Sequence, residues 1–280
     1  LAFSELQDEI SALLLELENL TSIKFKKVTY TDEANNLIVW TWDQTQTFTQ
    51  KVDAGVRFLD QLLKEEGHIY GVTTGYGDSC TVEVPNSLVD ELPIHLTRFH
   101  GCGLGEFFTP EMGRAILAAR LVSLSQGYSG VSWDLLNLLV EMLNKEVIPV
   151  IPQEGSVGAS GDLTPLSYVA GALIGERDVY YQDSIMPSAE AFKKASLAPI
   201  KLRPKEGLAI MNGTAVMTAL ACVAYDRAEY LSKLMARITA LSSLALKGNS
   251  NHFDDILFSV KPHPGQNKIA AWIQNDLNHH

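Results

Sequence analysis

TAVMTALACVAYDRAEYLSKLMARITALSSLAL, residues 214 to 246, is the stretch that decides the fold class of this chain. Its apolar residues recur at helical spacing, more regularly than anywhere else in the sequence, and Gly248 follows its end. Ordinary globular helices run for roughly 8–20 residues, and this one is longer. A helix of this length predicts a long helical bundle.

An uncharged stretch, Gly207–Tyr225, overlaps the start of this helix and invites a membrane interpretation. A helix that is apolar all round is either a membrane span or the centre of a large bundle. Polar residues interrupt the stretch and charged residues follow it: Asn212, Gly213, Thr214 and Thr218, then Asp226, Arg227 and Glu229. We therefore favour a buried bundle helix and expect no membrane partner.

Helical patterns also dominate the rest of the chain. We predict helices over residues 3–20, 46–66, 87–97, 109–127, 135–146, 165–175 and 188–195, the helix of 109–127 capped by Thr109 and that of 135–146 opened by Ser132. Residues 22–43 fit a short hairpin or a helix, and 178–203 look irregular apart from one short helix. The predicted fold is mainly α, with a loop-rich N-terminal domain over residues 1–200 and the beginning of a central helical bundle over 201–280.

Composition limits the possible partners and cellular compartment. The chain has 280 residues, 46% of them hydrophobic, and a formal charge of −11, which argues against nucleic-acid binding. Its three cysteines form no C-x-x-C pair, and no secretory signal pattern opens the chain, so we expect a cytoplasmic protein with free thiols. Cys102, between two glycines, is expected to be buried.

The run GSVGASGDLTP, residues 155–165, carries the most specific chemistry. In the tripeptide Ala159-Ser160-Gly161, the Gly161 amide nitrogen can attack the Ala159 carbonyl, because glycine tolerates the compressed backbone this requires. Loss of water from the ring and from the Ser160 hydroxyl then leaves an electrophilic methylidene carbon. No standard side chain supplies such an electrophile.

Three simpler interpretations of this run compete. It can be a turn that feeds a helix, with Thr164 as N-cap and Pro165 as the first helical residue. A phosphate-binding loop lacks support, since neither a Gly-Lys-Ser/Thr ending nor G-x-G-x-x-G spacing is present. A serine hydrolase elbow needs G-x-S-x-G, and here the second glycine follows Ser160 one residue early.

The whole run resembles the signature of the aromatic amino acid ammonia-lyases, which act on histidine, phenylalanine or tyrosine, and of the related aminomutases. Four further segments match this family in the expected order: YGVTTGYG at 70–77, FHGCGLG at 99–105, MNGT at 211–214 and KPHPGQ at 261–266. Tyr76 stands where the family usually has Phe. The resemblance extends from about residue 50 to the end of the chain.

The resemblance implies an ammonia-lyase that eliminates ammonia from an aromatic amino acid and leaves an α,β-unsaturated acid. Its cofactor would be 4-methylidene-imidazol-5-one (MIO), formed autocatalytically from Ala159-Ser160-Gly161, with no metal and no nucleotide. Family members are homotetramers of nearly twice this length, so the chain is expected to be an N-terminal half that is inactive by itself. An aminomutase and an inactive relative remain open alternatives.

Tyr70 is the candidate general base. A free phenol has a pKa of about 10, so the site must lower it for Tyr70 to remove a proton at neutral pH. The surrounding glycines allow this loop to fold over a substrate as a lid. The alternative is an aromatic side chain that anchors a turn.

Four further residues complete the predicted site. The resemblance implies that Asn212 hydrogen-bonds the electrophile or the substrate amine, although Asn is also a good helix cap. Asp162 orients the backbone for cyclisation or complements a helix dipole. The resemblance also implies that Phe99 and His100 face the substrate ring; their combination mixes the patterns of several lyases and leaves the choice of amino acid open. The other histidines lack metal-ligand spacing, so no metal is expected.

Overall fold

The structure is a computed structural model that describes residues 25–32, 35–42, 46–65, 67–261 and 263–278. The chain forms two compact units, Leu1–Ala219 and Leu220–His280, which divide inside the long helix α9 (Ala215–Ala245). The predicted helix over residues 3–20 lies outside the described residues. The predicted boundary at residue 200 rests on functional grounds. It stays a prediction, because the two units are defined only by contacts within the chain.

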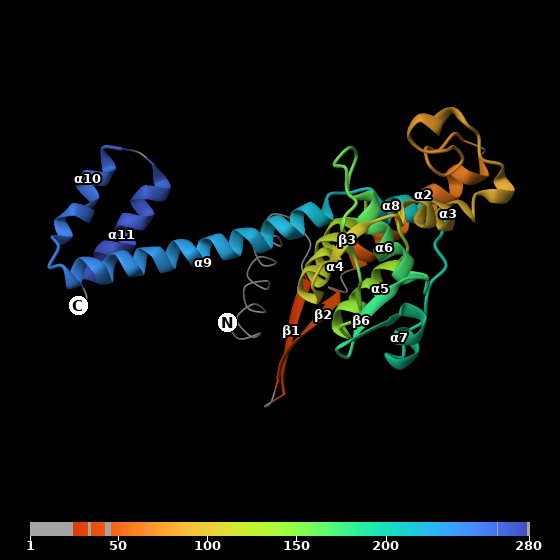
Figure 1. The fold of residues 1–280 in the computed structure, drawn as a ribbon. Coiled ribbons are helices and arrows are strands. Elements are labelled where there is room, and N and C mark those ends of the chain that lie inside the picture. Colours follow the sequence, from red (N-terminus) through yellow and green to blue (C-terminus); the bar gives the residue numbers. More distant parts are fainter. Residues whose placement is uncertain (1–24, 33–34, 43–45, 66, 262, 279–280) are drawn as a thin grey trace. The chain divides into compact units, whose positions relative to one another are not determined.

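The first unit is mainly helical, as predicted (Figure 1). Its helices are α2 (Gln46–Lys64), α3 (Leu92–His100), α4 (Pro110–Ser125), α5 (Trp133–Asn144), α6 (Leu163–Leu173), α7 (Ser188–Lys194) and α8 (Glu206–Met211). The core lies between α4, α5 and α6, whose fully buried side chains include Ile116, Leu121, Leu135, Leu139, Met142 and Leu166. Burial of these aliphatic side chains stabilises the unit that carries the tripeptide loop.

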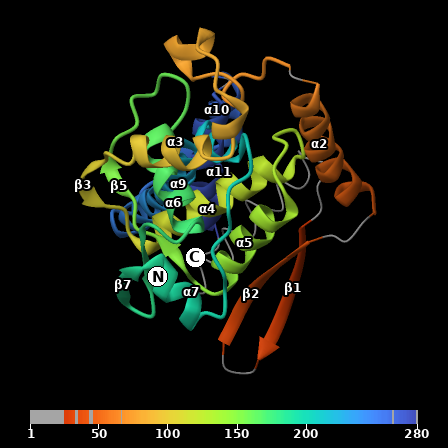
Figure 2. The ribbon, with the colours of Figure 1, turned by 90° about the vertical axis from the view of Figure 1, so that its right-hand side faces the viewer.

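Short antiparallel strands join the helices. Strands β1 (Phe25–Asp32) and β2 (Asn35–Trp42) pair in register from Phe25↔Trp42 to Asp32↔Asn35, which confirms the hairpin alternative (Figure 2). Strand β3 (Leu104–Phe107) pairs with β5 (Pro152–Glu154), and β6 (Asp178–Tyr181) lies between β4 (Ile148–Pro149) and β7 (Ser184–Pro187).

The β6–β7 hairpin corrects the expectation that residues 178–203 are irregular. Gln182 and Asp183 form its two-residue turn, both at positive φ (49° and 58°). Such turns usually contain glycine or asparagine, and this one has no glycine. The sequence therefore lacks the usual hairpin signal, although the predicted helix that follows is present as α7.

Helix starts agree with the predicted caps at two of three positions. The side chains of Thr109 and Ser132 accept hydrogen bonds from Met112 N and Leu135 N at the starts of α4 and α5. Helix α6 differs, because it begins at Leu163 and Asp162 occupies its N-cap position. The expected Thr164 cap is wrong, since that residue already lies within the helix.

The second unit continues α9 and adds α10 (Asp255–Ser259) and α11 (Pro264–Asn278). Its small core of Ala236, Ala240 and Ile273 joins α9 to α11. Helical residues 206–245 are long and apolar enough to cross a bilayer, but the core helix of a soluble protein meets the same criterion.

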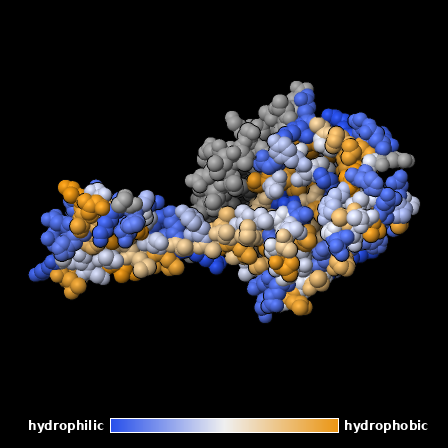
Figure 3. All heavy atoms as spheres, turned by 90° about the horizontal axis from the view of Figure 1, so that it is seen from above, coloured by the Kyte–Doolittle hydropathy of each residue, from blue (hydrophilic) through white to orange (hydrophobic). Residues whose placement is uncertain are grey.

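Hydrophobic side chains also lie at the molecular surface (Figure 3). Those on α9 include Tyr225, Leu231, Met235, Ile238 and Leu241.

Candidate active site

The tripeptide lies on a loop between β5 and α6. Ala159 and Ser160 are exposed, and Gly161 has a φ of +128°, a conformation that favours glycine. A Cβ on Gly161 would lie 2.7 Å from the Gly213 nitrogen and 3.0 Å from Asn212 Oδ1. In the described part of the chain, no residue accepts a hydrogen bond from the Gly161 amide. The loop therefore holds Gly161 closely against Asn212 and Gly213, in a conformation that a residue with a Cβ could not adopt without strain.

Asp162 anchors this loop to the start of α9. Its side chain is only 6% exposed, and its Oδ2 accepts hydrogen bonds from Val216 N and Met217 N, both at 3.0 Å. Its Oδ1 accepts a hydrogen bond from Ser156 Oγ at 2.9 Å, and its own amide donates to Gly213 O at 2.7 Å. The carboxylate thus complements a helix N-terminus, as one alternative predicted, but the helix is α9 and not its own α6.

A buried arginine holds the end of α8, next to the point where Asp162 anchors the loop. Arg120, on α4, is 4% exposed and donates hydrogen bonds to the carbonyl oxygens of Ala209 and Asn212 at the end of α8. Burial lowers the pKa of Arg120 to about 10, and the nearby Asp162 carboxylate opposes that shift. Arg120 therefore stays charged at neutral pH and stabilises the turn against which Gly161 packs.

We expect Asp162→Ala to lower the free energy of unfolding by about 2–3 kcal/mol, because two buried main-chain donors lose a charged acceptor. Urea denaturation followed by circular dichroism measures this loss. The matched control is Ser132→Ala, which removes an ordinary N-cap and should cost about 1 kcal/mol. A loss for Asp162→Ala no greater than the loss for this control would contradict the anchoring role.

Tyr70 lies on a loop that packs against α8. The loop turns at Gly71 (φ +67°), where a Cβ would lie 2.7 Å from Leu208 Cδ2. The Tyr70 side chain is 50% exposed, and its hydroxyl accepts a hydrogen bond from Gly77 N at 2.9 Å. Its ring contacts Tyr76 edge-on, with the centroids 6.4 Å apart. This loop therefore presents a phenol to solvent and holds it with a main-chain donor.

Tyr76 differs from Tyr70 in its environment. Burial raises the pKa of Tyr76 well above its usual range, and the neighbouring Tyr70 raises it further. Tyr76 therefore stays protonated at neutral pH. Of the two tyrosines in this loop, Tyr70 is the better candidate for a general base.

Phe99 and His100 form the last turn of α3. Phe99 is 80% exposed, and its ring contacts the His100 ring edge-on at 5.2 Å. His100 Nδ1 lies 3.0 Å from the Leu96 carbonyl oxygen, which can only accept, so Nδ1 carries the hydrogen and Nε2 stays available to a ligand. Pairing of β3 with β5 then joins this segment to the tripeptide loop.

The structure brings some predicted residues together and leaves others on separate segments. Gly161, Asn212 and Asp162 meet at one point, whereas no described hydrogen bond links Tyr70 or the Phe99–His100 pair to the tripeptide. Asn212 does occupy a helix cap position, but it is the C-cap of α8, whose backbone N–H donates to Leu208 O, whereas Asp162 caps the start of α9. The serine hydrolase alternative gains no support, since no described histidine hydrogen-bonds Ser160.

Sequence reasoning missed Arg120, and it was wrong about Cys102. The one available signal is that Arg120 lies among apolar residues of α4, where a charged side chain needs a buried polar partner. Cys102 is exposed, on the segment that follows α3. The described cysteines are all free, and the described residues contain no cluster of potential metal ligands.

Comparisons with known proteins identify the family of this chain. The sequence model of a family described as aromatic amino acid lyase matches residues 39–280. Human histidine ammonia-lyase is 37% identical over 239 residues, which cover 84% of this chain and 36% of that protein. Histidine ammonia-lyase from a Geobacillus strain is 37% identical over 265 residues, which cover 95% of this chain and 51% of that protein.

Solved structures show the same fold. Tyrosine aminomutase from Streptomyces globisporus has a TM-score of 0.79 and 36% identity, covering 84% of this chain and 44% of that one. Histidine ammonia-lyase from Trypanosoma cruzi has a TM-score of 0.75 and 29% identity, covering 82% and 45%. The chain spans about half, or less, of the length of these relatives.

Proposed function

Because this chain belongs to the aromatic amino acid lyase family, we propose that it carries the MIO-forming and proton-removing half of an ammonia-lyase. The substrate would be an aromatic L-amino acid, and the products ammonia and an α,β-unsaturated acid. One observation carries this proposal: Gly161, at φ +128°, packs directly against Asn212 and Gly213 while Asp162 anchors the loop. This close packing of Gly161 supports cyclisation of Ala159-Ser160-Gly161.

Each residue has a separate task in the proposed elimination. The substrate's Cβ proton is weakly acidic and its amine is a poor leaving group. MIO, when formed, supplies an electrophile for the amino nitrogen. Tyr70 removes the Cβ proton, the Asn212 amide hydrogen-bonds at the electrophile, and Phe99 and His100 face the ring.

Two measurements on the full-length protein test this function. Intact mass should be lower than the mass calculated from the sequence by two water molecules before any substrate is added. Phenylalanine, tyrosine and histidine should then be assayed for ammonia release and for the ultraviolet absorbance of the unsaturated acid. Full mass together with no turnover of any of the three would refute the proposal.

An aminomutase is the second candidate, and the similarity to tyrosine aminomutase favours keeping it. A mutase would add the ammonia back at Cβ and release a β-amino acid. Chromatography of the products distinguishes the two reactions. The lyase is the leading proposal because the human and Geobacillus relatives are histidine ammonia-lyases.

The proposal extends to assembly and location. The exposed apolar side chains of α9 support a homotetramer in which other helices cover them. Residues 1–280 on their own should accordingly be inactive. Free cysteines support a cytoplasmic location.

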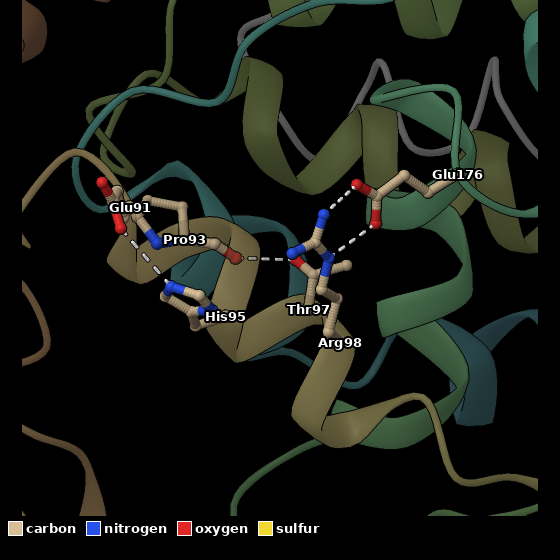
Figure 4. A network of polar contacts seen from close by, with 6 residues as sticks. All are labelled: Glu91, Pro93, His95, Thr97, Arg98 and Glu176. Atoms are coloured by element: carbon tan, nitrogen blue, oxygen red, sulfur yellow. Dashed lines mark hydrogen bonds and ion pairs between the residues drawn. The ribbon is translucent and has the colours of Figure 1, made fainter.

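We expect His100→Leu to shift the preference toward phenylalanine by on the order of tenfold or more, because the only polar group of the pair is lost. Ratios of kcat/KM for phenylalanine, tyrosine and histidine measure this shift. The matched control is His95→Leu on the same helix, where His95 pairs with Glu91 at 3.6 Å (Figure 4). Equal ratios in wild type and His100→Leu would remove His100 from substrate selection.

A further inference from the structure

We propose that Tyr168 and Arg177 are positioning residues that set substrate preference by holding the Phe99–His100 pair at a fixed place relative to the tripeptide. Neither residue needs to touch the substrate. The inference rests on the proposed function and extends it to residues that no motif identifies.

Both residues hold the backbone that directly follows the pair. The Gly103 amide donates a hydrogen bond to the Tyr168 hydroxyl at 3.1 Å, and Arg177 donates one to the Gly101 carbonyl at 3.3 Å. The Arg177 guanidinium also stacks 4.7 Å above the Tyr168 ring centroid, so the two contacts reinforce each other. A Cβ on Gly101 would collide with the Arg177 guanidinium. The segment after α3 is thus held at two points, one on each side of Cys102.

A third contact holds the helix turn that carries the pair. Arg98 makes two hydrogen bonds to Glu176, from Nε at 2.9 Å and from the terminal nitrogen at 2.5 Å (Figure 4). A bidentate pair of this kind fixes orientation as well as distance. Arg98 immediately precedes Phe99, whose ring is largely exposed. Backbone restraint, more than side-chain packing, therefore places the aromatic pair.

Helix α6 connects these contacts to the tripeptide. It begins two residues after Gly161, carries Tyr168 in its middle, and ends shortly before Glu176 and Arg177. Its inner face is fully buried through Leu166, Val169 and Leu173, so the helix behaves as a rigid spacer. The distance between the electrophile and the ring-facing pair is consequently determined by α6 and by its two contacts to the segment. A change in that distance should alter kcat/KM differently for phenylalanine, tyrosine and histidine, because their side-chain rings differ in size.

The test uses Tyr168→Phe and Arg177→Met in the full-length protein. Tyr168→Phe removes one hydroxyl and keeps the ring on which Arg177 stacks, so it remains informative if Arg177→Met does not fold. We expect the ratios of kcat/KM among phenylalanine, tyrosine and histidine to change by on the order of tenfold. Intact mass should still show loss of two waters, and Arg177→Lys, which keeps a donor for Gly101, should restore part of the wild-type ratio.

Matched controls separate positioning from general damage. Arg114, like Arg177, is partly buried and donates to a carbonyl near a helix end, that of Leu143 at 3.1 Å. Tyr180 donates its hydroxyl to the Phe108 carbonyl at 3.0 Å. Arg114→Met and Tyr180→Phe should keep the wild-type ratios. Unchanged kcat/KM ratios in Tyr168→Phe, or equal changes in Tyr180→Phe, would overturn the inference. A wild-type protein that is inactive on all three amino acids would instead refute the proposed function.

Discussion

Ser160→Ala is expected to abolish turnover of every aromatic amino acid by the full-length protein, because no methylidene group can form without the serine hydroxyl. The Ser160 side chain is exposed on its loop, and none of the described residues hydrogen-bonds it, so alanine should not disturb the fold. Ammonia release measures activity, and urea denaturation should give the wild-type midpoint.

Intact mass provides the decisive control for this variant. The wild-type chain should lack two waters relative to its calculated mass, and Ser160→Ala, which has no hydroxyl at this position, should lack at most the one released by ring closure. Ser184→Ala is a matched control, since Ser184 is also exposed and its hydroxyl only donates to Tyr181 O at 3.0 Å. Near-wild-type turnover by a folded Ser160→Ala protein would refute the MIO assignment.

Tyr70→Phe is expected to lower kcat by about 10²–10⁴-fold with little change in substrate binding, because the hydroxyl proposed as the general base is removed. The ring and its edge-on contact with Tyr76 are retained, while the hydrogen bond from Gly77 N is lost. Steady-state kinetics over a range of substrate concentrations separate kcat from KM.

The same loop offers a matched control for this prediction. Tyr76→Phe also removes one phenol hydroxyl, but burial keeps the Tyr76 pKa high, so its phenol is not available as a base. This variant should retain most of the wild-type kcat. A fall of less than tenfold for Tyr70→Phe, or an equal fall for both variants, would mean that Tyr70 only packs in the loop.

Local sequence signals determined several parts of this protein. Apolar periodicity predicted α9 to within one residue at each end, and Thr109 and Ser132 predicted the starts of α4 and α5. These features depend on backbone and side-chain preferences within a few residues, so they can be read without knowledge of the fold.

Only the tertiary structure decided how the site is held together. Asp162 caps a helix 54 residues further along the chain, and Arg120 binds a carbonyl 92 residues away. The β6–β7 hairpin and the Tyr168 and Arg177 contacts were likewise absent from the sequence prediction. Such contacts depend on which distant segments the packed core brings together. The sequence by itself therefore determined local features such as the extent of α9 and the starts of α4 and α5, and the packing of α3, α4, α6 and α8 determined which candidate site residues lie together.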